Sequence, residues 1–170
     1  MGGKKLLDLV EATKDEDVDY VLSDILPGII KTYGEVLVPD RIANLASGLI
    51  GAIFPKFNNI RLSYKRNRLE RNVSTMLNHI IESQETLSER IDELEKTTEG
   101  RCFIQQSSEM FLDNIIDEIQ PSKVQYSVNG YVNLLQTENA NFDMALMFFK
   151  TIAELNDIDI RVLKLMIGKI

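Results

Sequence analysis

The chain has very few of the residues on which most catalytic and metal sites depend. It contains one Cys, one His and no Trp among 170 residues. One Cys excludes an internal disulfide framework and a cysteine zinc site, and one His excludes nearly every histidine-based metal site. No phosphate-binding glycine loop, nucleophile elbow or H-E-x-x-H motif occurs. The sequence therefore predicts no enzymatic activity, no cofactor and no metal site.

The single His and the single Cys are interpreted as structural side chains. His79 lies within a predicted long helix, next to its apolar stripe. Cys102 follows Arg101 but has no His near it in the sequence, and such a neighbour is what activates a nucleophilic thiol. We therefore expect a structural or surface histidine and a small buried thiol.

Long apolar runs are also missing. The best candidate, residues 42–54, spans about 13 residues, whereas a membrane-spanning helix needs roughly 20. The start of the chain has Leu6 where a myristoylation signal needs Ser or Thr, and it has no apolar run of signal-peptide length. We predict a cytoplasmic protein that is not a conventional transmembrane protein, with association to a membrane surface as the alternative.

What the chain does have is the composition of a globular, helical protein. Apolar residues make up 44% and charged residues 26%, which is too apolar for a disordered chain. Apolar residues recur at helical spacing along most of the sequence. The predicted fold class is all-α. We expect short N-terminal helices over residues 1–55, starting with one at 4–12, a long coiled-coil-like central helix over 56–99, and a helical bundle over 100–170.

The C-terminal bundle has recognisable helix ends. Pro121 ends its first helix, and Asn141 or Asp143 caps a later one. The dipeptide Asn129-Gly130 favours a hairpin turn, although the residues after it continue helically. From residue 157 the chain is apolar to its last residue, which predicts either docking into the core or a further domain beyond it.

The central helix is the longest predicted element and the main predicted binding surface. Residues from about 58 to 98 contain no Pro or Gly, and apolar residues recur at steps of four and three. The stripe that we predict to bind a partner consists of Leu69, Val73, Met76, Ile80 and Leu87. It weakens at Ser83 and Arg90, and Gly100 is the expected C-terminal cap. A helix this long predicts the spine of a bundle or pairing with a protein partner, including a second copy.

A second predicted contact is the small-residue helix over residues 41–54, which we expect to end at Pro55. Small residues on it would let another backbone approach closely: Ala43, Ser47, Gly48 and Gly51. One interpretation is a tightly packed core helix. The other is a segment that inserts in a membrane or packs against a partner.

The charge is unevenly distributed along the chain. The formal net charge is −7, and a basic stretch at 56–71 lies between acidic stretches at 8–24 and 82–118. Four arginines are the candidate contacts for phosphate or anionic headgroups: Arg61, Arg66, Arg68 and Arg71. The alternative is that the basic stretch folds onto an acidic one. The acidic balance disfavours nucleic acid as a partner.

Two blocks of sequence carry a family resemblance. The first is RIANLASGLIGAIF followed by IRLSYKRNRLERNV, and the second is MFFKTIAELNDIDIRVLKLM. They resemble the abortive-infection Abi-alpha-type proteins, which are encoded by phages, mobile elements and their bacterial hosts. The matching positions are Arg61, Arg68, Arg71 and Asn72 in the first block, and Phe148, Leu155, Asp159 and Leu163 in the second. The resemblance covers about a third of the chain and implies a helical protein of phage–host conflict that acts by binding.

These features lead to one hypothesis and two alternatives. We expect a non-enzymatic interaction protein that affects infection or superinfection through the long-helix stripe and the small-residue helix. The first alternative is a membrane-perturbing effector that inserts residues 42–54. The second is a nucleic-acid-associated regulator that uses the basic residues of 61–71.

Overall fold

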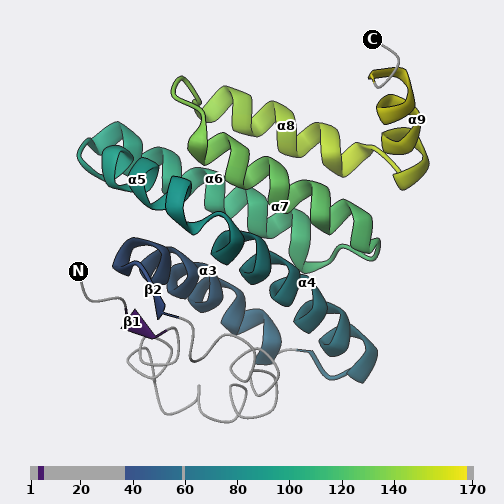
Figure 1. The fold of residues 1–170 in the computed structure, drawn as a ribbon. Helices are drawn as coiled ribbons and strands as arrows, with labels where there is room; N and C mark the ends of the chain where they lie inside the picture. The colour runs from purple at the N-terminus through teal and green to yellow at the C-terminus, as the bar shows by residue number, and fades with distance from the viewer. Residues whose placement is uncertain (1–3, 6–36, 59, 168–170) are drawn as a thin grey trace.

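The predicted helical fold class is confirmed. The computed structural model of the chain describes residues 4–5, 37–58 and 60–167, and in these residues helices account for almost all regular structure (Figure 1). The helices are α3 (Asp40–Asn58), α4 (Ser63–Glu82), α5 (Gln84–Glu95), α6 (Thr98–Ile116), α7 (Pro121–Gln136), α8 (Phe142–Glu154) and α9 (Asp157–Ile167).

A short pair of strands precedes the helices. The strand β1, Lys4–Lys5, pairs in antiparallel fashion with β2, Leu37–Val38. The predicted helix over 4–12 is therefore wrong at its first two residues, and its remainder, like the other helices predicted over 6–36, lies outside the described residues. Val38 precedes Pro39, and a residue before proline favours the extended backbone of a strand. The strand β2 ends there because proline has no N–H to donate to a neighbouring strand.

The core is built around α6 and α7. In Figure 1, α7 lies between α4 on one side and α8 on the other, and it also contacts α5 and α6. The helix α3 packs against α4, α5 and α6 with a face of buried apolar residues spaced three and four apart: Val38 just before it, then Ile42, Ala46, Leu49 and Ile53. The helix α9, yellow in Figure 1, lies beyond the end of α8.

The prediction of a single long central helix is wrong, because the helix is interrupted at Ser83. The structure has two helices here, α4 and α5, and Ser83 between them has φ −96° and ψ 8°. A straight helix over 63–95 would be about 50 Å long at 1.5 Å per residue. The bend instead keeps Leu87 and Ile91 in the same core as Leu69 and Ile80. The interruption falls at Ser83, where the apolar stripe weakens, and packing of both helices into one core fixes it there.

Other helix ends agree with the sequence in part. Pro121, which was predicted to end the preceding helix, stands at the start of α7, and α6 already ends at Ile116. The Asn141 side chain, one of the two predicted caps, caps α8 by accepting from the Met144 N–H at 3.0 Å. The predicted end of α3 at Pro55 is wrong, since the helix runs on to Asn58. Asn129-Gly130 forms no turn, because both residues lie inside α7.

Gly100 is not a C-terminal cap, contrary to the prediction. The side chain of Thr97 caps α6, and Gly100 lies in the first turn of that helix with its N–H donating to Thr97 Oγ1 at 2.9 Å. A Cβ at position 100 would overlap the carbonyl group of Leu94 at the end of α5. None of the described glycines has a positive φ, so the requirement at this position is for space.

Aromatic rings in contact join α6 to α7 and α8. The rings of Phe111 and Tyr131 are nearly parallel with centroids 4.4 Å apart, and Phe149 lies 6.2 Å from Phe111. Ser108 Oγ donates to the Ile104 carbonyl at 2.6 Å, so the Tyr131 hydroxyl donates to Ser108 Oγ across 2.7 Å. Burial raises the pKa of Tyr131 far above its ordinary value, and the bond to Ser108 opposes this in part.

We expect Gly100→Ala and Gly48→Ala to change stability in opposite directions. The alanine methyl at 100 would force the backbone at Leu94 to shift, which should destabilise the fold by about 1–3 kcal/mol. At Gly48, inside α3, no described residue lies within 4 Å of the added Cβ, and the substitution should stabilise by about 0.5–1 kcal/mol. Urea unfolding measures both, and a Gly100→Ala variant as stable as the wild-type chain would contradict this account of Gly100.

Tyr131→Phe should alter both stability and its dependence on pH. Loss of the bond to Ser108 should cost about 0.5–1.5 kcal/mol at neutral pH. Because folding raises the pKa of Tyr131, the folded state keeps a proton that the unfolded state releases near pH 10, and stability falls as pH rises above about 10. The variant should show a shallower fall. Tyr64→Phe, at an exposed ring, is the control and should change neither quantity.

Candidate functional site

The stripe predicted to bind a partner lies in the core of the chain itself. Leu69, Met76, Ile80 and Leu87 are completely buried and Val73 is 2% exposed. They pack against α7, α6 and α3, so the prediction that they form a binding surface is wrong. The apolar repeat correctly marks a contact face, but the partner of that face is the same chain.

The apolar face of the small-residue helix also packs against the core. Ala43 is completely buried and Ser47 is half-buried, whereas Gly48 and Gly51 are exposed with no described residue close to them. Close approach of another backbone therefore does not explain these two glycines within the described residues. Gly48 instead lines a shallow groove of about 330 Å³ between α3 and α6, with Leu49 and Ile104 among its apolar walls. None of the helices α3–α9 combines the length and the apolar character that crossing a bilayer requires.

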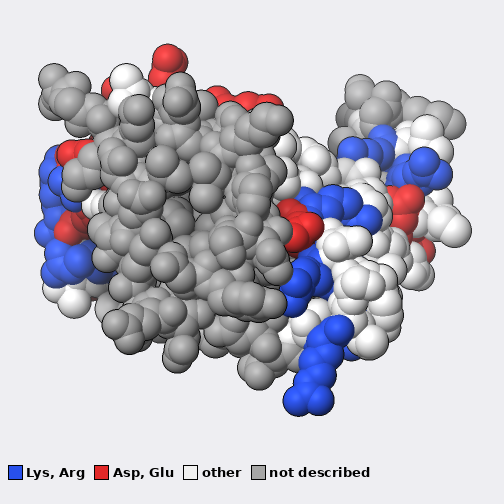
Figure 2. Space-filling model, turned by 90° about the horizontal axis from the view of Figure 1, so that it is seen from below, with Lys and Arg blue, Asp and Glu red and all other residues white. Residues whose placement is uncertain are grey.

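Part of the basic stretch folds onto the rest of the chain. Arg68 Nη2 lies 3.9 Å from Asp117 Oδ1, and Arg71 Nη2 donates to the Ile119 carbonyl at 3.3 Å. Arg61 is exposed and Arg66 is half-buried. Figure 2 shows described Lys and Arg side chains at the left and at the right of the visible face. The contacts of Arg68 and Arg71 therefore agree with the alternative that the basic stretch folds onto the chain.

The structure agrees with the interpretation of the lone histidine but not with that of the lone cysteine. His79 is half-buried and contacts the Gln125 amide on α7, with Glu82 Oε2 3.8 Å from its Nδ1, which fits a structural side chain. Cys102 is exposed, so the predicted buried thiol is wrong. Among the residues that the structure describes, no group of His, Cys, Asp and Glu side chains is arranged to hold a metal ion.

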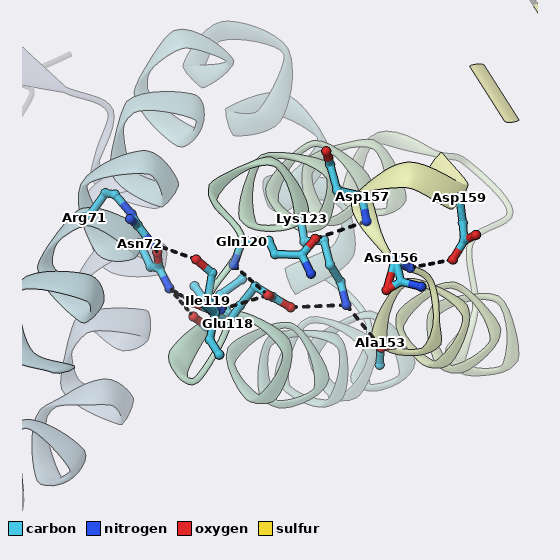
Figure 3. Close-up of polar contacts among 11 residues, drawn as sticks. Arg71, Asn72, Glu118, Ile119, Gln120, Lys123, Ala153, Asn156, Asp157 and Asp159 are labelled. Carbon is cyan, nitrogen blue, oxygen red and sulfur yellow. Dashed lines mark hydrogen bonds and ion pairs between the residues drawn. The ribbon is translucent and has the colours of Figure 1, made fainter. Parts of the chain in front are cut away.

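A polar junction surrounds the loop between α6 and α7, which sequence reasoning did not find (Figure 3). Glu118 Oε1 accepts from the N–H groups of Ile119 and Gln120, each at 2.8 Å, and Glu118 Oε2 lies 3.2 Å from Lys123 Nζ. The Lys123 and Glu118 side chains are only 9% and 16% exposed. A charge pair this well shielded is stable only when both partners are present and hydrogen-bonded.

The helix α4 holds the same loop from the other side. Asn72 is 1% exposed, and its Nδ2 donates to the carbonyls of Ile115 at 2.7 Å and Glu118 at 3.0 Å. The last carbonyls of a helix lack partners within the helix, so this amide satisfies groups that would otherwise be buried without one. Asn72 and the neighbouring Arg71 thus fix the end of α6 against α4.

The junction also positions the start of α9. Lys123 Nζ donates to the Ala153 carbonyl in the last turn of α8 at 3.1 Å. Gln120 Oε1 accepts from the N–H of Asp157, the first residue of α9, at 3.1 Å (Figure 3). A chain of polar contacts therefore runs from α4 through the α6–α7 loop to the α8–α9 connection.

The helix α9 presents an exposed apolar surface. Ile160 is its only buried residue, at 7% exposure. Six other apolar side chains are between 44% and 71% exposed: Ile158, Val162, Leu163, Leu165, Met166 and Ile167. We call these six residues the α9 surface. The apolar C-terminal segment was predicted either to dock into the core or to lead to a further domain, and within the described part of the segment only Ile160 is buried.

Charged side chains of α9 make contacts around this surface. Asp159 Oδ2 accepts from the Asn156 N–H at 2.9 Å and so caps the helix. Arg161 Nε lies 3.4 Å from Asp157 Oδ2, and Lys164 Nζ lies 4.3 Å from the centre of the Tyr126 ring. These contacts fix α9 at its start and along one side, while the α9 surface stays uncovered. The α9 surface is the candidate functional site.

Comparison with protein-family models, with curated proteins and with solved structures gives no match to the chain.

We expect Lys123→Met to destabilise the fold far more than Lys96→Met. Removing the Lys123 ammonium leaves the shielded Glu118 charge without its partner and should cost about 2–4 kcal/mol. Lys96 pairs with Asp92 at 3.3 Å between exposed side chains, and its loss should cost at most about 0.5 kcal/mol. Urea unfolding at neutral pH compares the two variants. Equal losses would show that the junction contributes no more than a surface ion pair.

Proposed function

We propose that this all-α chain is a non-enzymatic interaction protein of phage–host conflict, active in the cytoplasm, which binds another protein through the α9 surface. The exposure of six apolar side chains on one short helix is the observation that carries this proposal. The function is interference with infection or immunity to superinfection. The binding surface differs from the long-helix stripe, which lies in the core.

The physical argument is that α9 gains little from its own chain. A helix of 11 residues is marginally stable in water by itself, and only Ile160 of α9 is buried. The largest exposed apolar patch of a monomeric protein commonly measures a few hundred Å² and is often a functional site. Covering the α9 surface would stabilise the helix and provide binding energy from the same side chains.

The phage–host part of the proposal is supported by the sequence resemblance. Residues of its two blocks take part in the structure that presents α9. Arg71 and Asn72 hold the α6–α7 loop, Asp159 caps α9, and Leu163 belongs to the α9 surface. These positions support a role of the resembling residues in building the site.

The two alternative functions receive less support. Membrane insertion of residues 42–54 would remove Ile42, Ala46 and Ile53 from the core, where all three are completely buried. Nucleic-acid binding through the basic stretch would compete with the contacts of Arg68 and Arg71 to the α6–α7 loop.

Plaque counting on bacteria that express the chain tests the proposal. We expect fewer plaques in a strain without defence systems, or more plaques in a strain that carries one such system. Val162→Glu combined with Leu165→Glu should return the count to that of bacteria without the chain, because two charges at exposed positions block apolar contact.

The matched control is Met147→Glu on α8, which is exposed but lies outside the α9 surface. It should leave the plaque count of the wild-type chain unchanged. Circular dichroism should show that all variants keep their helical content. An unchanged plaque count in both strains with the wild-type chain would refute the conflict role. Full activity of the double α9 variant would refute the α9 surface as the site.

A further inference from the structure

The helix α9 is apolar on two faces rather than one. At 100° per residue, Ile160 and Leu163 point toward one side, which is the side that Ile160 buries against the chain. The opposite side carries the outer stripe, spaced by steps of four and three residues: Ile158, Val162, Leu165 and, beside it, Met166. Such spacing is that of the contact seam between paired helices.

The edges of the outer stripe carry opposite charges. On the helical wheel Arg161 lies on one side of the stripe and Asp159 on the other. The Arg161 side chain is 74% exposed and uses its Nε toward Asp157, which leaves its two terminal nitrogens available to a further partner. Asp159 caps the helix through Oδ2 and retains a second oxygen.

We infer that a second copy of this chain covers the outer stripe of the α9 surface, with the two α9 helices running in the same direction about a two-fold axis. This inference rests on the proposed function and names the partner of its site. With the helices in the same direction, the Arg161 edge of each copy meets the Asp159 edge of the other, and two opposite-charge contacts form. With the helices in opposite directions, like edges would meet.

The size of the surface fits a reversible dimer. The four exposed side chains of the outer stripe present on the order of 500 Å² per copy, so two copies would bury about 1,000 Å², near the lower end of specific interfaces. Two-fold pairing is also the commonest arrangement of protein oligomers, because one self-complementary patch serves both copies.

Disulfide cross-linking tests the pairing and its direction. In a Cys102→Ser background, the single substitutions Ile158→Cys, Val162→Cys and Leu165→Cys should each form a covalent dimer on mild oxidation. Helices that run in the same direction place each of these residues opposite itself, within the roughly 4.4–6.8 Å between Cα atoms that a disulfide requires. Met147→Cys, at an exposed position of α8, is the matched control and should stay monomeric.

Sedimentation of the uncross-linked wild-type chain gives an independent readout. Its mass should rise from monomer toward dimer with concentration. Arg161→Glu should weaken the dimer, because the carboxylate introduced in one copy would then face Asp159 of the other. A cross-link that forms only between Ile158→Cys and Leu165→Cys chains in a mixture would overturn the direction. A monomer at every concentration, with no cross-link at the three positions, would overturn the second copy as partner.

The two proposals fail separately. If the chain is monomeric but the double α9 variant still loses its effect on plaque counts, the second copy is refuted and the proposed function stands. If the chain dimerises through α9 but never changes plaque counts, the dimer stands and the proposed function is refuted.

Discussion

The stacking of Tyr131 on Phe111 is the contact on which the rest of the fold depends. It joins α6 to α7, the two helices against which α3, α4, α5 and α8 are packed. The hydroxyl of Tyr131 would be costly to bury without a partner, and Ser108 supplies one from α6. The aromatic contact therefore combines apolar burial with a hydrogen bond that sets how the two helices face each other.

The polar junction links the packed helices α6 and α7 to the C-terminal part of the chain. Asn72 on α4 and Lys123 on α7 bind the same short loop, and Lys123 and Gln120 reach the connection between α8 and α9. Polar groups in a shielded place are directional, unlike apolar contacts, so they fix position as well as adding stability. The placement of α9 is thus decided largely by polar contacts, while its apolar residues stay exposed.

This division explains why the proposed binding surface lies on α9 rather than on the other helices. The apolar faces of α3, α4 and α7 are used within the chain, and the arginines of α4 that reach the α6–α7 loop serve the same purpose. In α9 the number of apolar residues exceeds what the core accepts, because one face already contains Ile160 and a second face remains. An excess of this kind is what a protein partner can cover.

Local interactions within one helical turn explain what the sequence by itself determined: the all-α class, a helix boundary close to Pro121 and a cap of α8 at Asn141 or Asp143, of which the structure uses Asn141. Such features depend on neighbouring residues, and the sequence contains these directly. Only the tertiary structure decided that the stripe from Leu69 to Leu87 packs inside the chain, that the helix bends at Ser83, and that Gly100 makes room for Leu94. An apolar period specifies which face of a helix is buried, but the residues that cover that face come from distant parts of the chain. The same reason applies to the α9 surface, whose exposure depends on where the core ends.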